Sequence, residues 1–229
     1  MTSSEAGAWR GFQAGLEREA HDLLHRLEFR PTLARHGHVE VVGALGMGLL
    51  CTRDIDLHLY PRSMTTEGWM GVVADLARTP GVQCMRLHNL WDHGPPDFAW
   101  RPPGLPRHRG YLTELQYVIL RGMAAGWHVD LWLQPESAGD EAVQLRERVR
   151  AAQRADLRLG PAVLAMKAAL RALDLPRRIP SLYVYLAALG DGVRALPALA
   201  DALRRRGVAL ADVLEAALAA SGPSDASGA

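Results

Sequence analysis

The segment Val41–Tyr60, VVGALGMGLLCTRDIDLHLY, decides the fold class of this 229-residue chain. A β-favouring run ends at Gly43, and two more glycines follow within five residues. From Asp54 onwards polar and apolar residues alternate, which is typical of a strand with one buried face. We therefore expect three consecutive elements, a strand, a helical turn and a second strand, at residues 38–43, 45–50 and 54–60.

Two aspartates lie on the polar face of the second strand. Asp54 and Asp56 are two residues apart, so both side chains point to one side while Ile55 and Leu57 point into the core. Two carboxylates roughly 7 Å apart on a strand repel each other, and they persist most readily beside a cation. Hard oxygen ligands suit Mg²⁺. The alternative is a pair of solvated surface aspartates on an unrelated α/β fold.

Gly43 and Ala44 end the first strand and open the helical turn. A glycine there lets backbone N–H groups approach a phosphate, and the positive end of the helix adds attraction. A phosphate-binding turn that leads into a metal-binding pair predicts a nucleoside triphosphate site. A Rossmann site is disfavoured, because GALGMG is not G-x-G-x-x-G and the acidic pair comes too early for a ribose contact.

A third carboxylate is expected from the run WHVDLWL at residues 127–133, in which Asp130 is the only acid. If this strand lies beside the one with Asp54 and Asp56, three carboxylates can hold two Mg²⁺ ions. Glu114 shares a strand face with Gln116 in YLTELQYVI, residues 111–119. Next to the Asp130 strand, Glu114 could accept the proton of an attacking hydroxyl. The alternative is a solvent-facing polar pair.

The composition changes near residue 138, where Gly, Pro and Trp give way to Ala, Leu and Arg. We expect an α+β domain, an all-helical domain and a disordered tail, at residues 1–138, 139–220 and 221–229. The other expected helices are 5–28, 65–78, 140–156, 161–173, 181–190, 195–206 and 209–220, and the other strands are 82–90, 111–119 and 127–134. The Pro-rich loop 91–110 is an acceptor pocket, a lid or an insertion without catalytic role.

The ordered set of Gly turn, aspartate pair and third strand aspartate resembles the nucleotidyltransferase superfamily to which DNA polymerase β belongs. It is most similar to a small bacterial branch, the kanamycin, lincosamide and minimal nucleotidyltransferases. The resemblance spans about residues 38–134, and more loosely the later helices. It implies an α+β nucleotidyltransferase fold, a mixed β-sheet with helices, followed by an all-α domain.

The resemblance also implies site residues. Asp54, Asp56 and Asp130 would ligate Mg²⁺, and Gly43 and Ala44 would line the triphosphate. The chain departs from the family at Ala44, where serine is common. The missing hydroxyl removes a phosphate hydrogen bond worth about 1.5–3 kcal/mol.

Lysine occurs once in the chain: 25 of the 26 basic residues are arginine, and the other is Lys167. It falls at the edge of the apolar stripe of the helix expected at 161–173, where its charge needs solvent or an anion. Kanamycin-type relatives bring a lysine from the helical domain to the triphosphate, and the resemblance implies this nucleotide-binding role for Lys167. The alternative is a lysine at the domain boundary whose head reaches solvent.

The formal net charge of +1 gives no support to a broad basic surface for nucleic acid or anionic membrane. No apolar run reaches the roughly 18 residues of a membrane span, and the first residues lack the pattern of a signal peptide. We expect a cytoplasmic protein without membrane contact. The two cysteines cannot build a disulfide framework or a four-thiolate zinc site, and both Cys51 and Cys84 are expected as buried thiols.

The sequence thus predicts a Mg²⁺-dependent nucleotidyltransferase. It would move a nucleoside monophosphate from an NTP, with ATP as the expected co-substrate, to a hydroxyl of a small-molecule acceptor such as an antibiotic-like compound, and release pyrophosphate. One alternative is nucleotidylation (AMPylation) of a partner protein such as a toxin. Another is a non-catalytic nucleotide-binding or interaction protein. Nucleic acid is not expected as a partner.

Overall fold

The computed structural model describes residues 3–90, 110–118, 126–135, 140–175, 179–208 and 210–220. The chain divides into two compact units. One, the sheet unit, contains the described residues between Arg10 and Arg150. The other, the helical unit, contains the start of the first helix up to Trp9 and the described residues from Ala151 onwards. The domain boundaries expected at 138 and 220 stay predictions.

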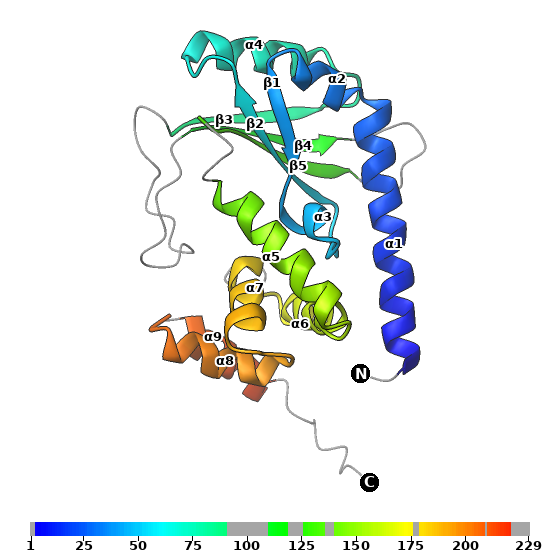
Figure 1. Ribbon diagram of the computed structural model, residues 1–229, viewed down its shortest axis with the longest axis vertical. Coiled ribbons are helices and arrows are strands. Elements are labelled where there is room, and N and C mark those ends of the chain that lie inside the picture. Colours follow the sequence, from blue (N-terminus) through cyan, green and yellow to red (C-terminus); the bar gives the residue numbers. More distant parts are fainter. Residues whose placement is uncertain are drawn as a thin grey trace. The chain divides into compact units, whose positions relative to one another are not determined.

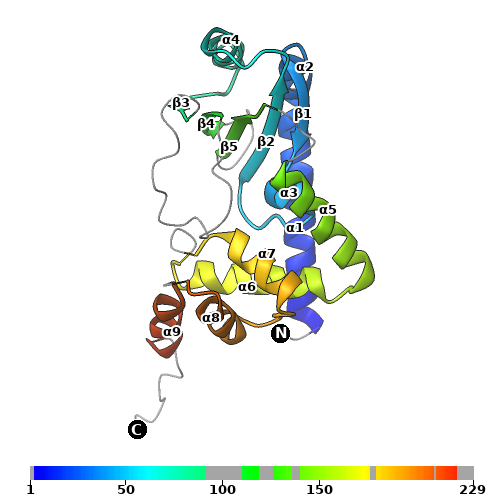
Figure 2. The ribbon, with the colours of Figure 1, turned by 60° about the vertical axis from the view of Figure 1, so that its left-hand side comes forward.

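A mixed β-sheet forms the centre of the sheet unit (Figure 1). Its strands in the described residues are β1 (Gly37–Val41), β2 (Asp54–Pro61), β3 (Cys84–Asn89), β4 (Tyr111–Val118) and β5 (Trp127–Leu133). Their spatial order is β1-β2-β5-β4-β3, which can be followed in Figure 2. The β2–β5 pair is parallel and the other neighbouring pairs are antiparallel.

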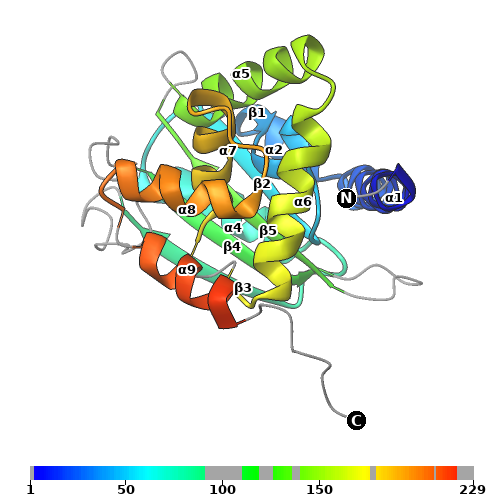
Figure 3. The same ribbon diagram turned by 90° about the horizontal axis from the view of Figure 1, so that it is seen from below.

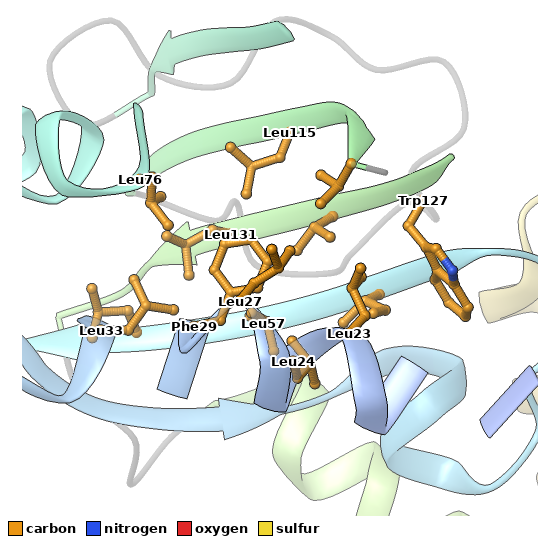
Figure 4. Close-up of a cluster of buried hydrophobic side chains, with 14 of the residues drawn as sticks. Leu23, Leu24, Leu27, Phe29, Leu33, Leu57, Leu76, Leu115, Trp127 and Leu131 are labelled. Carbon is orange, nitrogen blue, oxygen red and sulfur yellow. The ribbon is translucent and has the colours of Figure 1, made fainter. Parts of the chain in front are cut away.

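One face of the sheet carries the apolar core. Helices α1 (Ser3–Arg26), α2 (Phe29–Ala34) and α4 (Thr66–Ala77) supply leucines, valines and aromatic rings to it (Figure 4). From the sheet come alternate residues such as Leu57, Leu115 and Leu131, each at most 2% exposed. The alternation that predicted β2 and β5 is therefore confirmed, and the residues between these leucines point to the opposite face.

Two local features differ from the sequence analysis. It predicted no helix at 29–34, where α2 begins three residues after the end of α1, although Pro31 lies within it. Proline is tolerated there because N–H groups in the first turn have no intrahelical partner. The helical turn is α3 (Gly43–Met47), so it begins two residues earlier than expected. Its C-cap is Gly48, whose φ of 68° favours glycine.

Helix α5 (Glu141–Ala155) is attached to the sheet unit through Asp140. This side chain, 3% exposed, caps the helix by accepting hydrogen bonds from the backbone N–H groups of Ala142 and Val143, at 2.8 and 3.1 Å. Its other oxygen lies 2.5 Å from His58 Nδ1 and accepts a bond of 2.7 Å from the Tyr60 hydroxyl. One buried carboxylate therefore joins the start of α5 to β2.

The helical unit contains α6 (Leu159–Ala172), α7 (Ser181–Gly190), α8 (Leu196–Arg205) and α9 (Leu210–Ala220), which pack against one another (Figure 3). Leu164, Val184 and Leu199, each at most 2% exposed, lie in its interior. In the described part of the chain, every helix is too short or too polar to cross a bilayer.

Cys84 is a correction to the sequence analysis. It lies on the edge strand β3 and is exposed, whereas Cys51 is buried as expected. A strand at the edge of a sheet has a neighbouring strand on one side only, so its side chains are less covered. The sequence pattern does not show that β3 lies at the edge. The loop expected at 91–110 lies, except for Gly110, outside the described residues, as does the tail expected at 221–229.

Asp140→Asn should lower the free energy of unfolding by about 1.5–3 kcal/mol at pH 7, because the charged bond to His58 is lost while the backbone cap can persist. Burial alone would raise the pKa of Asp140, but the bonds and charge of His58, with the Tyr60 and Val143 bonds, outweigh it and hold this pKa well below its usual range. The stabilisation is therefore fully present above the pKa of an unfolded aspartate, about 3.9, and is lost progressively as pH falls from there through the lower pKa of Asp140 in the folded protein.

Urea unfolding at pH 7 and at pH 3 measures this difference. The exposed Asp22 forms an ion pair of 3.3 Å with Arg26, one turn further along α1, and provides the control variant Asp22→Asn. Equal unfolding free energies of Asp140→Asn and Asp22→Asn at pH 7 would contradict the assignment.

Candidate metal centre

The face of the sheet opposite the apolar core carries a transverse row of charged residues. Asp56 on β2 is in register with Asp130 on β5, which is in register with Glu114 on β4, and Glu114 faces Arg86 on β3. Residues in register on neighbouring strands share a face with side chains roughly 5 Å apart. The row thus brings together carboxylates that are up to 74 residues apart in the sequence.

A histidine lies between two of the predicted aspartates. His128 on β5 is in register with Asp54, and its Nδ1 lies 3.3 Å from Asp54 Oδ1. Its Nε2 lies 3.2 Å from Asp130 Oδ1. The imidazole therefore bridges carboxylates from two strands.

The cluster Glu114, His128 and Asp130 offers one donor atom from each side chain, all within 4.8 Å of one another. His128 was missed in the sequence analysis, although it shares a strand face with Asp130 in WHVDLWL. The signal that could have identified His128 is the strand alternation, because His128 is two residues from Asp130, which was already assigned to the site. Glu114 Oε2 also lies 3.3 Å from His88 Nε2 on β3.

The charges of these groups shift their protonation. The Asp54 carboxylate raises the pKa of His128 to about 9, with further support from the charges of Asp130 and Glu114, although burial opposes the shift. Burial is the main cause that raises the pKa of Asp130, and the charges of Asp56, Asp54 and Glu114 act in the same direction. The cluster thus holds excess negative charge that a cation would relieve.

Gly43 lies directly against Asp56. Its φ is 56°, and a Cβ built there would overlap the Asp56 carboxylate. The backbone fixes this approach, because the Val42 N–H donates to the Asp56 carbonyl oxygen at 3.0 Å. Any side chain at residue 43 would displace the carboxylate. Glycine is therefore required both by the positive φ and by the close approach of Asp56.

Ala44 is placed differently from a phosphate-facing side chain. It packs against the apolar core, so a phosphate contact from this residue would come from its backbone amide. Arg146 on α5 holds the same turn from outside: its Nη1 donates to Glu40 Oε2 at 2.7 Å and to the Val41 carbonyl at 2.8 Å. The turn at Gly43 and Ala44 is thus held by the apolar core on one side and by the Arg146 guanidinium on the other.

Lys167 lies on α6, and the contacts given below are with other residues of the helical unit. It is buried, 7% exposed, and its Nζ donates to the Tyr185 hydroxyl at 2.9 Å and lies 5.3 Å from the centre of that ring. The alternative of a lysine whose head reaches solvent was therefore wrong, because Lys167 is buried with the apolar residues of α6. Its role at a triphosphate stays a prediction.

His58, on the same face of β2 as Asp54 and Asp56, is buried and hydrogen-bonded to Asp140. Arg53 pairs with Glu19 on α1, with Nη2 and Oε2 3.0 Å apart. Both side chains are thus explained by structural contacts.

The residues on this face fit a divalent cation. Asp54 Oδ1, His128 Nε2 and Asp130 Oδ1 are buried atoms without a well-formed hydrogen bond in the described part of the chain. Buried polar atoms normally have hydrogen-bond partners. A bound cation would supply the partner that these three atoms lack. Carboxylate oxygens suit Mg²⁺, and the imidazole nitrogen adds a ligand of borderline softness.

Comparison with solved structures identifies the fold. A cytoplasmic RNA terminal U-transferase matches with a TM-score of 0.54 and 16% identity over 80% of this chain and 54% of that one. The Cid1 poly(U) polymerase matches with a TM-score of 0.51 and 17% identity with a UTP analogue bound, and with 0.50 and 15% with MgGTP bound. These two matches cover 76% and 74% of this chain and 48% of Cid1.

The chain spans about half the length of these structures, which belong to the DNA polymerase β-like nucleotidyltransferase superfamily. The α+β nucleotidyltransferase fold expected from the sequence is confirmed. The kanamycin-like branch stays a prediction. No family model matches the sequence, and no curated protein matches it significantly.

Gly43→Ala should destabilise the protein by at least 1 kcal/mol more than Gly207→Ala, and it should weaken Mg²⁺ binding. Gly207 has a similar φ of 66°, but a Cβ there meets no atom of the described residues within 4 Å. Both variants pay the same backbone strain, whereas only the first overpacks the turn against Asp56. Urea unfolding and calorimetric Mg²⁺ titration measure the two effects, and equal behaviour of the two variants would refute the close-approach argument.

Asp54→Asn should lower the pKa of His128 from about 9 towards 6.5 in the metal-free protein, because the strongest contact that favours the imidazolium loses its charge. Titration of the His128 ring by NMR measures this value. Asp22→Asn, remote from β5 in sequence and exposed, is the control. An unchanged His128 pKa in Asp54→Asn would contradict the described contact.

Proposed function

We propose that this protein is a divalent-metal-dependent nucleotidyltransferase that moves a nucleoside monophosphate from an NTP to a hydroxyl group and releases pyrophosphate. The observation that carries the proposal is the register of Asp56, Asp130 and Glu114 across three strands, beside Asp54 and the Gly43 turn. Support comes from the fold, because solved structures that share it include Cid1 with MgGTP bound.

Each carboxylate has a role in this proposal. Asp54, Asp56 and Asp130 would hold Mg²⁺, most simply two ions, which neutralise triphosphate charge and activate the hydroxyl when bound. Gly43 and the Ala44 amide would approach the phosphates. Glu114 would take the hydroxyl proton as the new bond to the α-phosphorus forms and the bond to the pyrophosphate oxygen breaks. Most of the rate would come from positioning and charge neutralisation.

The acceptor is the open part of the proposal. The resemblance to antibiotic nucleotidyltransferases favoured a small molecule, and the net charge of only +1 disfavoured nucleic acid. The matched structures include a poly(U) polymerase and an RNA terminal U-transferase, which brings an RNA 3′-hydroxyl into consideration as well. A partner protein is the third candidate. We infer the hydroxyl chemistry from the site and assign the acceptor by experiment, with ATP and UTP as the first nucleotides to test.

Asp54→Asn and Asp56→Asn should each reduce pyrophosphate release by about 10³-fold or more, because loss of a metal-holding carboxylate removes several kcal/mol of charge stabilisation. The assay supplies α-labelled ATP or UTP with Mg²⁺ and separate panels of RNA oligonucleotides and hydroxyl-bearing small molecules. Transfer of label identifies the acceptor class. Asp22→Asn should keep wild-type turnover.

Two outcomes would count against the proposal. Wild-type turnover in both aspartate variants would remove the metal hypothesis. Nucleotide binding without label transfer to small molecules, RNA or a co-expressed partner protein would favour the non-catalytic alternative.

A further inference from the structure

The carboxylates on the sheet face opposite the core explain a Mg²⁺ site, and the imidazole that pairs with them adds a donor of a different kind. His128 is placed between Asp54 and Asp130, at 3.3 and 3.2 Å, and its Nε2 is a buried atom without a well-formed hydrogen bond in the described residues. Imidazole is the ligand that first-row transition metals accept readily and that Mg²⁺ does not favour.

We propose that His128, with Glu114 and Asp130, forms an imidazole-containing cation site that binds a first-row transition-metal ion in preference to Mg²⁺. This inference deepens the proposed function and rests on the same metal centre, with Glu114 as a ligand of the ion in place of its role as proton acceptor. The sequence analysis assigned only aspartates to that centre, so the nitrogen ligand and the metal preference are new.

The geometry of the three side chains supports one shared ion. Metal–oxygen and metal–nitrogen bonds are about 2.0–2.5 Å long, so two donors on opposite sides of an ion lie roughly 4–5 Å apart. The donor atoms of Glu114, His128 and Asp130 all lie within 4.8 Å of one another. One ion could therefore contact all three with small side-chain adjustments and without movement of the strands.

The backbone holds the ligands rigidly. Glu114 and Asp130 are an in-register pair on β4 and β5, and His128 is two residues from Asp130 on the same face. Ligands on paired strands keep their spacing better than ligands on loops. Glu114 Oε2 also lies 3.3 Å from His88 Nε2 on the neighbouring strand β3.

Charge balance is consistent with an ion at this position. Asp54, Asp56, Asp130 and Glu114 contribute four carboxylates around one imidazole, with Asp54 partly exposed at 46% and Asp130 more buried at 24%. A divalent ion at the buried end would compensate the carboxylates that solvent reaches least. The more exposed Asp54 and the neighbouring Asp56 would remain available for a second ion with the triphosphate.

Mn²⁺ is a demanding probe, since it binds nitrogen- and oxygen-containing sites more weakly than the later first-row ions. Calorimetry at one fixed pH measures Mn²⁺ and Mg²⁺ affinity of the full chain, and electron spin-echo spectroscopy of bound Mn²⁺ detects a directly coordinated imidazole nitrogen. We expect that signal in the wild type. His128→Gln should abolish it and weaken Mn²⁺ binding about 10-fold or more, without weakening Mg²⁺ binding.

His38→Gln is the matched control, because the His38 side chain on β1 is 65% exposed and lies outside the three-residue cluster. It should keep the nitrogen signal and the Mn²⁺ affinity within about 3-fold. Mn²⁺ binding without a nitrogen signal, or unchanged Mn²⁺ affinity in His128→Gln, would overturn the inference and leave the nucleotidyltransferase proposal standing. A wild-type protein that binds neither ion would overturn both.

Discussion

Like charges face each other where β2 pairs with β5, because the parallel register sets Asp56 opposite Asp130 and extends the row to Glu114. The apolar side of the same strands requires this register: Leu57 and Leu131 are opposite each other and fully packed in the core. A shift by one residue would exchange the two faces of a strand. Hydrophobic burial on one face thus maintains an unfavourable charge cluster on the other, where a cation can be bound.

The sequence predicted which side chains share a face of a strand, but it did not predict which strands lie next to each other in the sheet. Alternation around Asp54, Asp56 and Asp130 reports which side chains share a side, and those predictions agree with the structure. The order β1-β2-β5-β4-β3 depends on packing over long sequence distances, which period-two patterns do not contain. The sequence could therefore place Asp130 beside Asp54 and Asp56 only on the assumption that β2 and β5 are neighbours.

Contacts made by residues outside the motifs explain most of what was missed. His128 became informative only when the register placed it against Asp54. Asp140 precedes a helix, which suggests a cap, but its bonds to His58 and Tyr60 span about 80 residues and depend on how α5 meets the sheet. Lys167 was judged from one helix, while Tyr185, its partner, is on the next. Pattern analysis of single elements cannot detect such pairs.

The turn at Gly43 has a consequence for how this chain would change over evolutionary time. The hydrogen atom at its Cα leaves space for the Asp56 carboxylate, so the two positions are constrained together. A descendant that no longer needed the carboxylate could replace Asp56 by a smaller residue, after which larger residues at position 43 would be tolerated apart from the cost of φ. Paired loss of the glycine and the aspartate would therefore identify lineages that have kept the scaffold and abandoned the chemistry.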